Sequence, residues 1–160
     1  MLQLTLLRHA KADPDDGKID DFDRALADIG RTDVPRTARA LVEGGASPNI
    51  VLVSEARRTR ETWELARPFF PKADICWLRS LYLCPAETLL AEAVRSGGER
   101  VMLVGHNPGL HELASRLAHR NTKLDMRLRA GFPTAAGAIF DRKNEEASWK
   151  LRAYVTPRDL

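Results

Sequence analysis

Leu2-Gln-Leu-Thr-Leu-Leu7, followed at once by Arg8-His9-Ala10, is the stretch that decides the fold. The first six residues carry four leucines and predict a buried strand that opens the sheet. Arg8 and His9 would then stand at the carboxyl end of this strand, which is the edge where open α/β sheets bind ligands. The stretch therefore predicts an α/β fold with a cation and an imidazole at its ligand-binding edge.

Two later segments repeat this arrangement. Residues 101–104 form a second apolar run that ends in Gly105-His106, and residues 50–53 form a third that ends in Ser54 and leads to Arg57-Arg58-Thr59-Arg60. A lone histidine at a strand end is usually structural, and an arginine cluster at a helix start is usually a solvated face. Three strand ends that carry only imidazole, guanidinium and hydroxyl groups instead favour a site for a compact dianion such as phosphate.

The rest of the chain alternates strand and helix patterns. Helices are predicted over residues 32–43, 56–67, 85–94 and 110–118, and further strands over residues 75–78, 136–140 and 149–155. The first of these helices is expected to begin at residue 32 because Pro35 fits only the first turn of a helix. This alternation predicts a single three-layer α/β/α domain over residues 1–160, with a mainly parallel sheet and helices on both faces.

Composition excludes several classes of protein. The chain has 160 residues and a net charge of +3, with 25 basic and 22 acidic residues interspersed, which gives no indication of nucleic-acid binding. It has no apolar stretch long enough to span a membrane and no signal peptide, so we expect a cytoplasmic protein without a membrane partner. Cys76 and Cys84 fit no zinc pattern and are expected to be reduced. Residues 116–129 are rich in arginine and predict a solvated helix and loop or, alternatively, a docking patch for an acidic partner.

Residues 12–23 are rich in aspartate and contain Pro14 and Gly17, which is typical of a loop above the end of the first strand. A calcium-binding loop that began at Asp13 and Asp15 would require glycine where the chain has Lys18. The sequence therefore predicts neither a metal site nor a cofactor.

The motifs at the strand ends resemble those of the histidine phosphatase superfamily, which includes phosphoglycerate mutases and acid phosphatases. They are Arg8-His9, Ser54-x-x-x-Arg58-x-x-Glu61-Thr62 and Val104-Gly105-His106-Asn107-Pro108. Further stretches are similar to SixA-like phosphohistidine phosphatases, namely Arg8-His-Ala-Lys11, Asp21-x-x-Arg24-x-Leu26, Leu81-Tyr82-x-x-Pro85, Gly105-His-Asn-Pro-Gly109, Phe132-Pro-Thr134 and Thr156-Pro-Arg-Asp-Leu160. The resemblance covers essentially the whole chain and implies a phosphoglycerate mutase-like fold.

The same resemblance implies the roles of the site residues. His9 would be the nucleophile that forms a phosphohistidine intermediate, while Arg8, Arg58 and His106 would bind the phosphoryl oxygens and Arg24 and Asn107 would contact the substrate. Arg58 is preferred to its neighbouring arginines because it follows Ser54 by the family spacing. The chemistry is consistent with these roles, since positioned cations stabilise a transferring phosphoryl group and a neutral imidazole offers a lone pair.

Two departures from the family pattern bear on the substrate. Ala10 replaces a common glycine, and Arg79-Ser80 stands where many relatives carry a glutamate that acts as general acid. Four residues of the aspartate-rich loop remain as substitutes, namely Asp13, Asp16, Asp20 and Asp21. A missing acid favours a substrate with a good leaving group, so we expect a metal-independent phosphatase that acts on phosphohistidine in a signalling or phosphotransfer protein. The alternatives are a phosphomonoesterase for small phosphate esters and a weakly active phosphoprotein-binding module.

Overall fold

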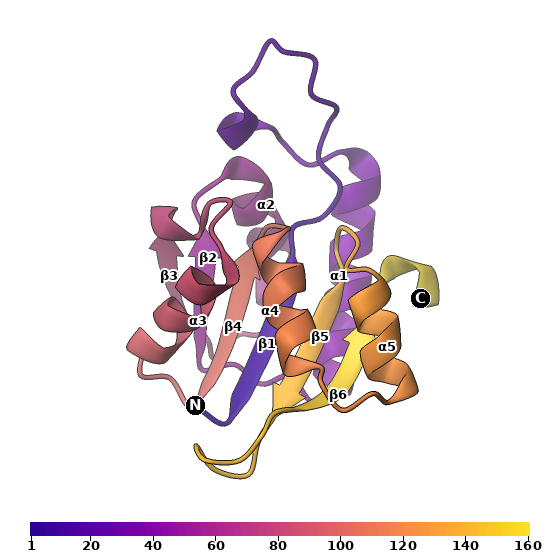
Figure 1. The fold of residues 1–160 in the computed structure, drawn as a ribbon. Helices are drawn as coiled ribbons and strands as arrows, with labels where there is room; N and C mark the ends of the chain where they lie inside the picture. The colour runs from indigo at the N-terminus through magenta and orange to yellow at the C-terminus, as the bar shows by residue number, and fades with distance from the viewer.

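Strand β1 (Gln3–Arg8) lies inside a six-stranded sheet in the computed structural model, which describes residues 1–160 (Figure 1). The other strands are β2 (Ile50–Ser54), β3 (Asp74–Leu78), β4 (Arg100–Gly105), β5 (Gly137–Asp141) and β6 (Lys150–Val155). Their order across the sheet is β3-β2-β4-β1-β5-β6. The three strands with functional residues at their ends, β2, β4 and β1, are therefore direct neighbours.

Helices cover both faces of this sheet. The five α-helices are α1 (Asp28–Glu43), α2 (Arg57–Ala66), α3 (Ala86–Arg95), α4 (Gly109–Leu117) and α5 (Lys123–Ala130). In Figure 1, α3, α4 and α5 lie in front of the sheet and α1 and α2 lie behind it. None of these helices is long and apolar enough to cross a membrane.

The core is divided by the sheet into two clusters, because successive side chains of a strand point to opposite faces. Leu4 and Leu6 of β1 belong to a cluster of 20 buried residues with the apolar faces of α3, α4 and α5. Leu7 belongs to a second cluster of 16 buried residues with α1 and α2. A fully buried β1 positions the residues that follow it on a rigid support.

The sheet is mixed, so the expectation of a mainly parallel sheet is met only in part. β1 pairs with β4, and β2 pairs with β3 and β4, in parallel, whereas β5 is antiparallel to both β1 and β6. The backbone N–H of Ala135 donates to the carbonyl of His9 at 3.0 Å, so the chain enters β5 at the carboxyl edge of β1. It can then only run back along β1 in the opposite direction.

Helix α1 begins four residues earlier than the predicted start at residue 32, so Pro35 lies beyond its first turn. Pro35 cannot donate to the carbonyl of Arg31, but Arg31 is an exposed residue and water can supply that hydrogen bond. Contacts with Lys11 hold the additional turn, because its carbonyl accepts from the N–H of Ala27 at 2.9 Å. A side chain at Gly30 would place its Cβ 2.3 Å from the same carbonyl oxygen, so only glycine allows this approach.

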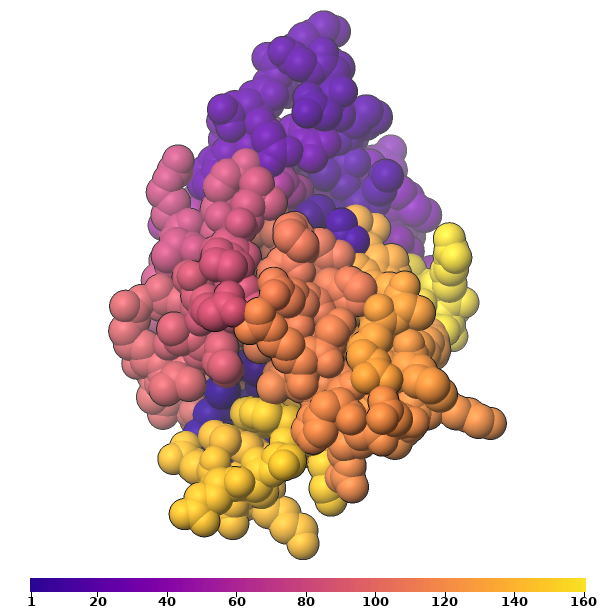
Figure 2. Space-filling view, in the orientation of Figure 1, coloured from indigo at the N-terminus to yellow at the C-terminus, as the bar shows by residue number.

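The aspartate-rich loop between β1 and α1 rises above the edge of the sheet at which β1 ends (Figure 1) and forms the upper end of the molecule in Figure 2. Its base is closed by a bridge between Ala12 and Leu26 and by the N–H of Asp13, which donates to the carbonyl of Ala25 at 2.9 Å. Near its return the loop contains a short 3₁₀ turn, Asp21–Asp23. The loop thus starts and ends beside the site residues.

Candidate active site

His9 and His106 are brought together by the register of two parallel strands. Arg8 at the end of β1 pairs with Gly105 at the end of β4, so the next residue of each strand is a histidine. The ring centroids of His9 and His106 are 5.2 Å apart at an interplanar angle of 52°. The site predicted from the strand ends is therefore assembled at the carboxyl edge of the sheet.

Hydrogen bonds fix the orientation of both rings. Nδ1 of His9 lies 2.8 Å from the carbonyl oxygen of Ala10, which can only accept, so Nδ1 carries the proton and Nε2 keeps its lone pair. Nε2 of His106 lies 2.8 Å from the hydroxyl of Ser54, at the end of neighbouring β2. The Ser54 hydroxyl can donate its proton to Nε2 of His106, and in that arrangement Nδ1 carries the proton of the neutral ring and is a donor.

Arg58 enters the site from the first turn of α2, and only 2% of its surface is exposed. Its guanidinium lies 5.8 Å from the centroid of the Tyr82 ring, which in turn packs edge-on against His106. Arg57, by contrast, has a side chain that is 54% exposed and paired with Glu61. Arg60 lies over the Trp77 ring, on the outside of the helix. Of the three clustered arginines, only Arg58 reaches the histidines.

Two further residues of α2, Thr62 and Glu61, attach this helix to the surroundings of the site. The hydroxyl of Thr62 accepts from the N–H of Ala10 at 3.1 Å and donates to the carbonyl of Arg58 at 2.6 Å. The carboxylate of Glu61 accepts from the N–H of Leu26 at 2.9 Å, at the base of the loop. Thr62 thus joins α2 to the residue after His9, and Glu61 joins it to the loop above the site.

Arg8 and Asn107 share one anchor. NH1 of Arg8 and Nδ2 of Asn107 both donate to the carbonyl of Phe132 at 2.9 Å. Burial and the nearby Arg58 guanidinium lower the pKa of Arg8. A guanidinium whose charge is disfavoured by a second guanidinium nearby is characteristic of a site that binds an anion.

Asp21, which the sequence offered as one of four substitutes for a general acid, places a carboxylate beside the predicted phosphate ligand Arg58. Oδ2 of Asp21 accepts from NH2 of Arg58 at 2.9 Å and from the Tyr82 hydroxyl at 2.6 Å. Arg24, which was predicted to contact substrate, donates its Nε to Oδ1 of Asp21 at 3.0 Å. The Tyr82 hydroxyl, together with Arg58 and Arg24, lowers the pKa of Asp21 to about 2. Asp21 is therefore ionised at neutral pH and binds part of the Arg58 guanidinium.

Both histidines are held in the neutral state. Burial lowers the pKa of His9 to about 4, and the charges of Arg58, Arg8 and Arg24 contribute in the same direction. Burial also lowers the pKa of His106 to about 3, with further contributions from His9 and Arg58. At neutral pH, Nε2 of His9 consequently has a free lone pair, and the positive charges of Arg58, Arg8 and Arg24 lie nearby.

Several buried polar atoms of these residues have no partner within the protein. They are Nε of Arg8, Nε of Arg58, Nδ1 of His106 and Oδ1 of Asn107. Buried polar groups are almost always hydrogen-bonded, so unpartnered donors on three residues next to His9 are consistent with a ligand that supplies acceptors. Arg8 and Arg58 lie close enough to His9 for their charges to lower its pKa, and the His106 ring lies next to the His9 ring. Guanidinium and imidazole donors of this kind suit the oxygens of a phosphoryl group.

The position of a general acid in relatives is occupied by other contacts. Ser80 donates its hydroxyl to the buried Glu92 at 3.0 Å, and the Arg79 guanidinium lies 4.4 Å from the centroid of the Phe22 ring. Among the four candidate aspartates, Asp21 is the one whose carboxylate contacts Arg58. Tyr82 was not predicted as a site residue, although a tyrosine in a motif just after a strand end is a signal that could have suggested it.

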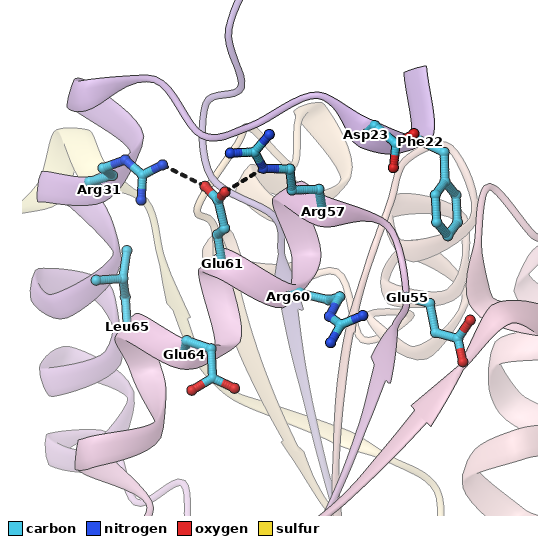
Figure 3. A pocket seen from close by; sticks show the side chains of 9 residues that line it. All are labelled: Phe22, Asp23, Arg31, Glu55, Arg57, Arg60, Glu61, Glu64 and Leu65. Carbon is cyan, nitrogen blue, oxygen red and sulfur yellow. Dashed lines mark hydrogen bonds and ion pairs between the residues drawn. The ribbon is translucent and has the colours of Figure 1, made fainter. Parts of the chain in front are cut away.

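The cavity in Figure 3, of about 520 Å³, lies on the outer side of α2 and contains neither histidine. Three of its charged residues pair with one another, since the carboxylate of Glu61 bridges Arg31 at 2.7 Å and Arg57 at 2.8 Å. Glu61 of this lining also holds the base of the aspartate-rich loop, and the cavity is separate from the two histidines of the candidate site. No group of three or more His, Cys, Asp or Glu side chains is positioned to hold a metal ion.

Comparison with known proteins gives a consistent picture, although no protein-family profile matches the chain. A protein assigned as the phosphohistidine phosphatase SixA of Agrobacterium tumefaciens is 30% identical, with a TM-score of 0.85 and coverage of 98% of both chains. An uncharacterized chloroplast protein of Arabidopsis thaliana is 29% identical over 97% of this chain and 78% of its own length.

Two further solved structures share the fold at lower identity. The protein histidine phosphatase SixA in complex with tungstate is 22% identical, with a TM-score of 0.77 over 99% of both chains. A mycobacterial glucosyl-3-phosphoglycerate phosphatase is 19% identical, with a TM-score of 0.66 over 96% of this chain and 98% of its own.

Proposed function

Because the chain belongs to the histidine phosphatase superfamily and, within it, to the SixA-like group, we propose that it removes the phosphoryl group from phosphohistidine in a signalling or phosphotransfer protein. The observation that carries the proposal is that Arg8, Arg58 and His106, each with an unpartnered nitrogen, lie close to His9, whose Nε2 keeps its lone pair. The reaction requires no metal in this proposal, because the developing charge on the phosphoryl oxygens is balanced by guanidinium and imidazole donors.

The first half of the reaction follows from the orientation of His9. Nε2 attacks phosphorus and forms a new N–P bond, while the N–P bond to the substrate imidazole breaks. The substrate imidazole leaves as a neutral molecule when its other ring nitrogen already carries a proton. The Nδ1–H of His9 donates to the Ala10 carbonyl, and this bond stabilises the positive charge that the ring acquires on phosphorylation.

The second half is hydrolysis of the phosphorylated His9. A water molecule attacks phosphorus, the bond to Nε2 breaks, and inorganic phosphate leaves a neutral His9 ready for the next cycle. Arg8, Arg58 and His106 bind the same phosphoryl oxygens in both halves. The site therefore needs only one set of donors.

The state of Asp21 supports a phosphoramidate over an alkyl phosphate as substrate. An alkyl phosphate must expel an alkoxide, and a positioned acid accelerates such a step by roughly 100-fold to 10,000-fold. Asp21, with a pKa of about 2, holds no proton to donate at neutral pH. Phosphohistidine does not need that proton, because its leaving group is an imidazole with a pKa near neutrality.

Steady-state kinetics on a phosphohistidine peptide, p-nitrophenyl phosphate and glucose 6-phosphate, all in the presence of EDTA, test the proposal. We expect kcat/KM to be highest for the phosphohistidine peptide, intermediate for the aryl phosphate and lowest for the sugar phosphate. His9→Ala provides the background rate. A sugar phosphate hydrolysed as fast as the peptide would instead support a small-molecule phosphomonoesterase, and no turnover of any substrate would support a binding module.

A further inference from the structure

An open groove of about 740 Å³ adjoins the site on the side of α5 and the C-terminal turn Pro157–Asp159. Arg8 and Asn107 line both the groove and the site, so the two are continuous. The remaining walls come from α5, from the segment that leads into β5, and from the end of β6, which lie together on one side of the molecule in Figure 1. Whatever is attached to a phosphoryl group at His9 can extend into this groove.

The groove has an aromatic wall that is fixed to the site. The Phe132 ring stacks between His111, at 6.4 Å and 19°, and Tyr154, at 5.7 Å and 23°. The Tyr154 hydroxyl donates to the carbonyl of Gly131, and the carbonyl of Phe132 accepts from Arg8 and Asn107. Phe132 and Tyr154 are almost fully buried, so these rings give the groove a rigid base whose position is fixed relative to the phosphoryl site.

The groove is also positively charged. Arg8 stands at its inner end, Arg127 lies 5.1 Å from the centroid of the Tyr154 ring, and Arg158 is exposed on the C-terminal turn without an ion pair. Asp159 is the only carboxylate in the lining, and its Oδ2 already accepts from Arg127 and from the N–H and hydroxyl of Thr156. Arg158 is thus free to bind an additional anion.

We propose that this groove binds acidic residues that flank the phosphohistidine of a protein substrate, an inference that rests on the proposed function. Sites for small molecules enclose most of the ligand surface, whereas this groove is open along its length. Arginine and aromatic residues are enriched in protein–protein interfaces, where charge complementarity selects partners and accelerates association. Of the arginine-rich residues 116–129, Arg127 lines the groove but is paired with Asp159, and Arg116 is occupied by Glu87 and Glu112. Arg158 is therefore the cation of the groove that is free to bind an acidic residue of the substrate.

Two phosphohistidine peptides of equal length test the inference, one with aspartate and glutamate at the flanking positions and one with serine at the same positions. Wild-type protein should hydrolyse the acidic peptide with a kcat/KM about tenfold higher at low ionic strength, and this preference should shrink as salt is added. Arg158→Glu should abolish or reverse the preference without changing the rate on p-nitrophenyl phosphate by more than about twofold, and Arg158→Ala should give an intermediate result.

Arg120→Glu is the matched control, because Arg120 is an exposed arginine without an ion pair beyond the far end of α4. This variant should keep the preference for the acidic peptide. If wild-type protein hydrolyses both peptides equally well, or if Arg158→Glu keeps the preference for the acidic peptide, the groove does not bind acidic residues of the substrate. The proposed function stands in either case. If wild-type protein hydrolyses p-nitrophenyl phosphate but neither peptide, the proposed function and the inference both fail.

Discussion

At the scale of single residues, the site depends on keeping an imidazole neutral among cations. His9 is 9% exposed and lies close enough to Arg58, Arg8 and Arg24 for their charges to oppose its protonation. A protonated His9 would have no lone pair to attack phosphorus, so the charges that would attract a dianion also keep the proposed nucleophile unprotonated. Burial and the nearby positive charges therefore both lower the pKa of His9.

We expect His9 to titrate near pH 4 in the folded protein, because burial and the surrounding arginines lower its pKa. The measurement is an NMR titration of the His9 ring resonances, with urea-unfolded protein as the control, where the same ring should titrate near 6.5. Between these values the unfolded chain binds protons that the folded chain does not, so the free energy of unfolding should decrease as the pH falls below about 6.5. A His9 resonance that titrates near 6.5 in the folded protein would contradict this account of the nucleophile.

Arg58→Ala should lower kcat/KM by roughly 30-fold to 1000-fold, because it removes a buried guanidinium that stabilises the transferring phosphoryl group. Arg57→Ala is the matched control from the adjacent position, where the side chain is exposed and paired with Glu61, and it should cost far less. Steady-state kinetics with p-nitrophenyl phosphate compare the two variants. Equal or reversed losses would mean that Arg58 is not the phosphate ligand.

At the scale of elements, helix α2 connects the end of β1, the aspartate-rich loop and the candidate site. Its first turn supplies Arg58, its second turn supplies Thr62 to the backbone after His9, and Glu61 fixes the base of the aspartate-rich loop. The loop in turn carries Asp21 to Arg58 and Tyr82. A change in the contact between α2 and the loop should therefore alter the position of Asp21 next to Arg58, even when the proposed phosphate ligands themselves are unchanged.

Glu61→Ala should loosen the aspartate-rich loop, because the N–H of Leu26, Arg31 and Arg57 all lose their acceptor. We expect trypsin to cleave after the exposed Lys18 several-fold faster than in wild-type protein, and urea unfolding to show a loss of about 1 to 3 kcal/mol. Glu64→Ala on the same helix is the control, since Glu64 is 54% exposed and makes only a 3.8 Å ion pair with Arg67. Identical cleavage rates in the two variants would refute the role of Glu61.

The sequence predicts the strand ends well because strand periodicity and a following histidine or arginine are local signals. His9, His106, Ser54 and Arg58 are at the positions that these signals indicate. The contact of Asp21 with Tyr82 is not predictable in this way, because it joins residues 61 positions apart whose loops are packed together by tertiary structure. The early start of α1 was missed for the same reason, since it depends on the approach of Gly30 to Lys11.

At the scale of the whole molecule, the faces of the sheet form the hydrophobic core, whereas one edge of the sheet carries the candidate site. Its two faces are buried under helices in clusters of 20 and 16 residues, while all the proposed phosphate ligands gather at one edge. The segment that leads into antiparallel β5 places Phe132 at this same edge, where its carbonyl accepts hydrogen bonds from Arg8 and Asn107. The mixed character of the sheet, which local sequence patterns do not reveal, thus gives the site one of its walls.

The central claim is that His9 becomes phosphorylated during turnover, and trapping the intermediate tests it most directly. Protein mixed with a ³²P-labelled phosphohistidine peptide is quenched within milliseconds in alkali, where phosphohistidine survives, and is then digested and sequenced by mass spectrometry. We predict label on the His9 peptide of wild-type protein and none on His9→Ala, which should fold because the ring is replaced by a smaller side chain at the end of a buried strand. Label that persists in His9→Ala, or rapid wild-type turnover with no label on His9 at any time point, would contradict the account.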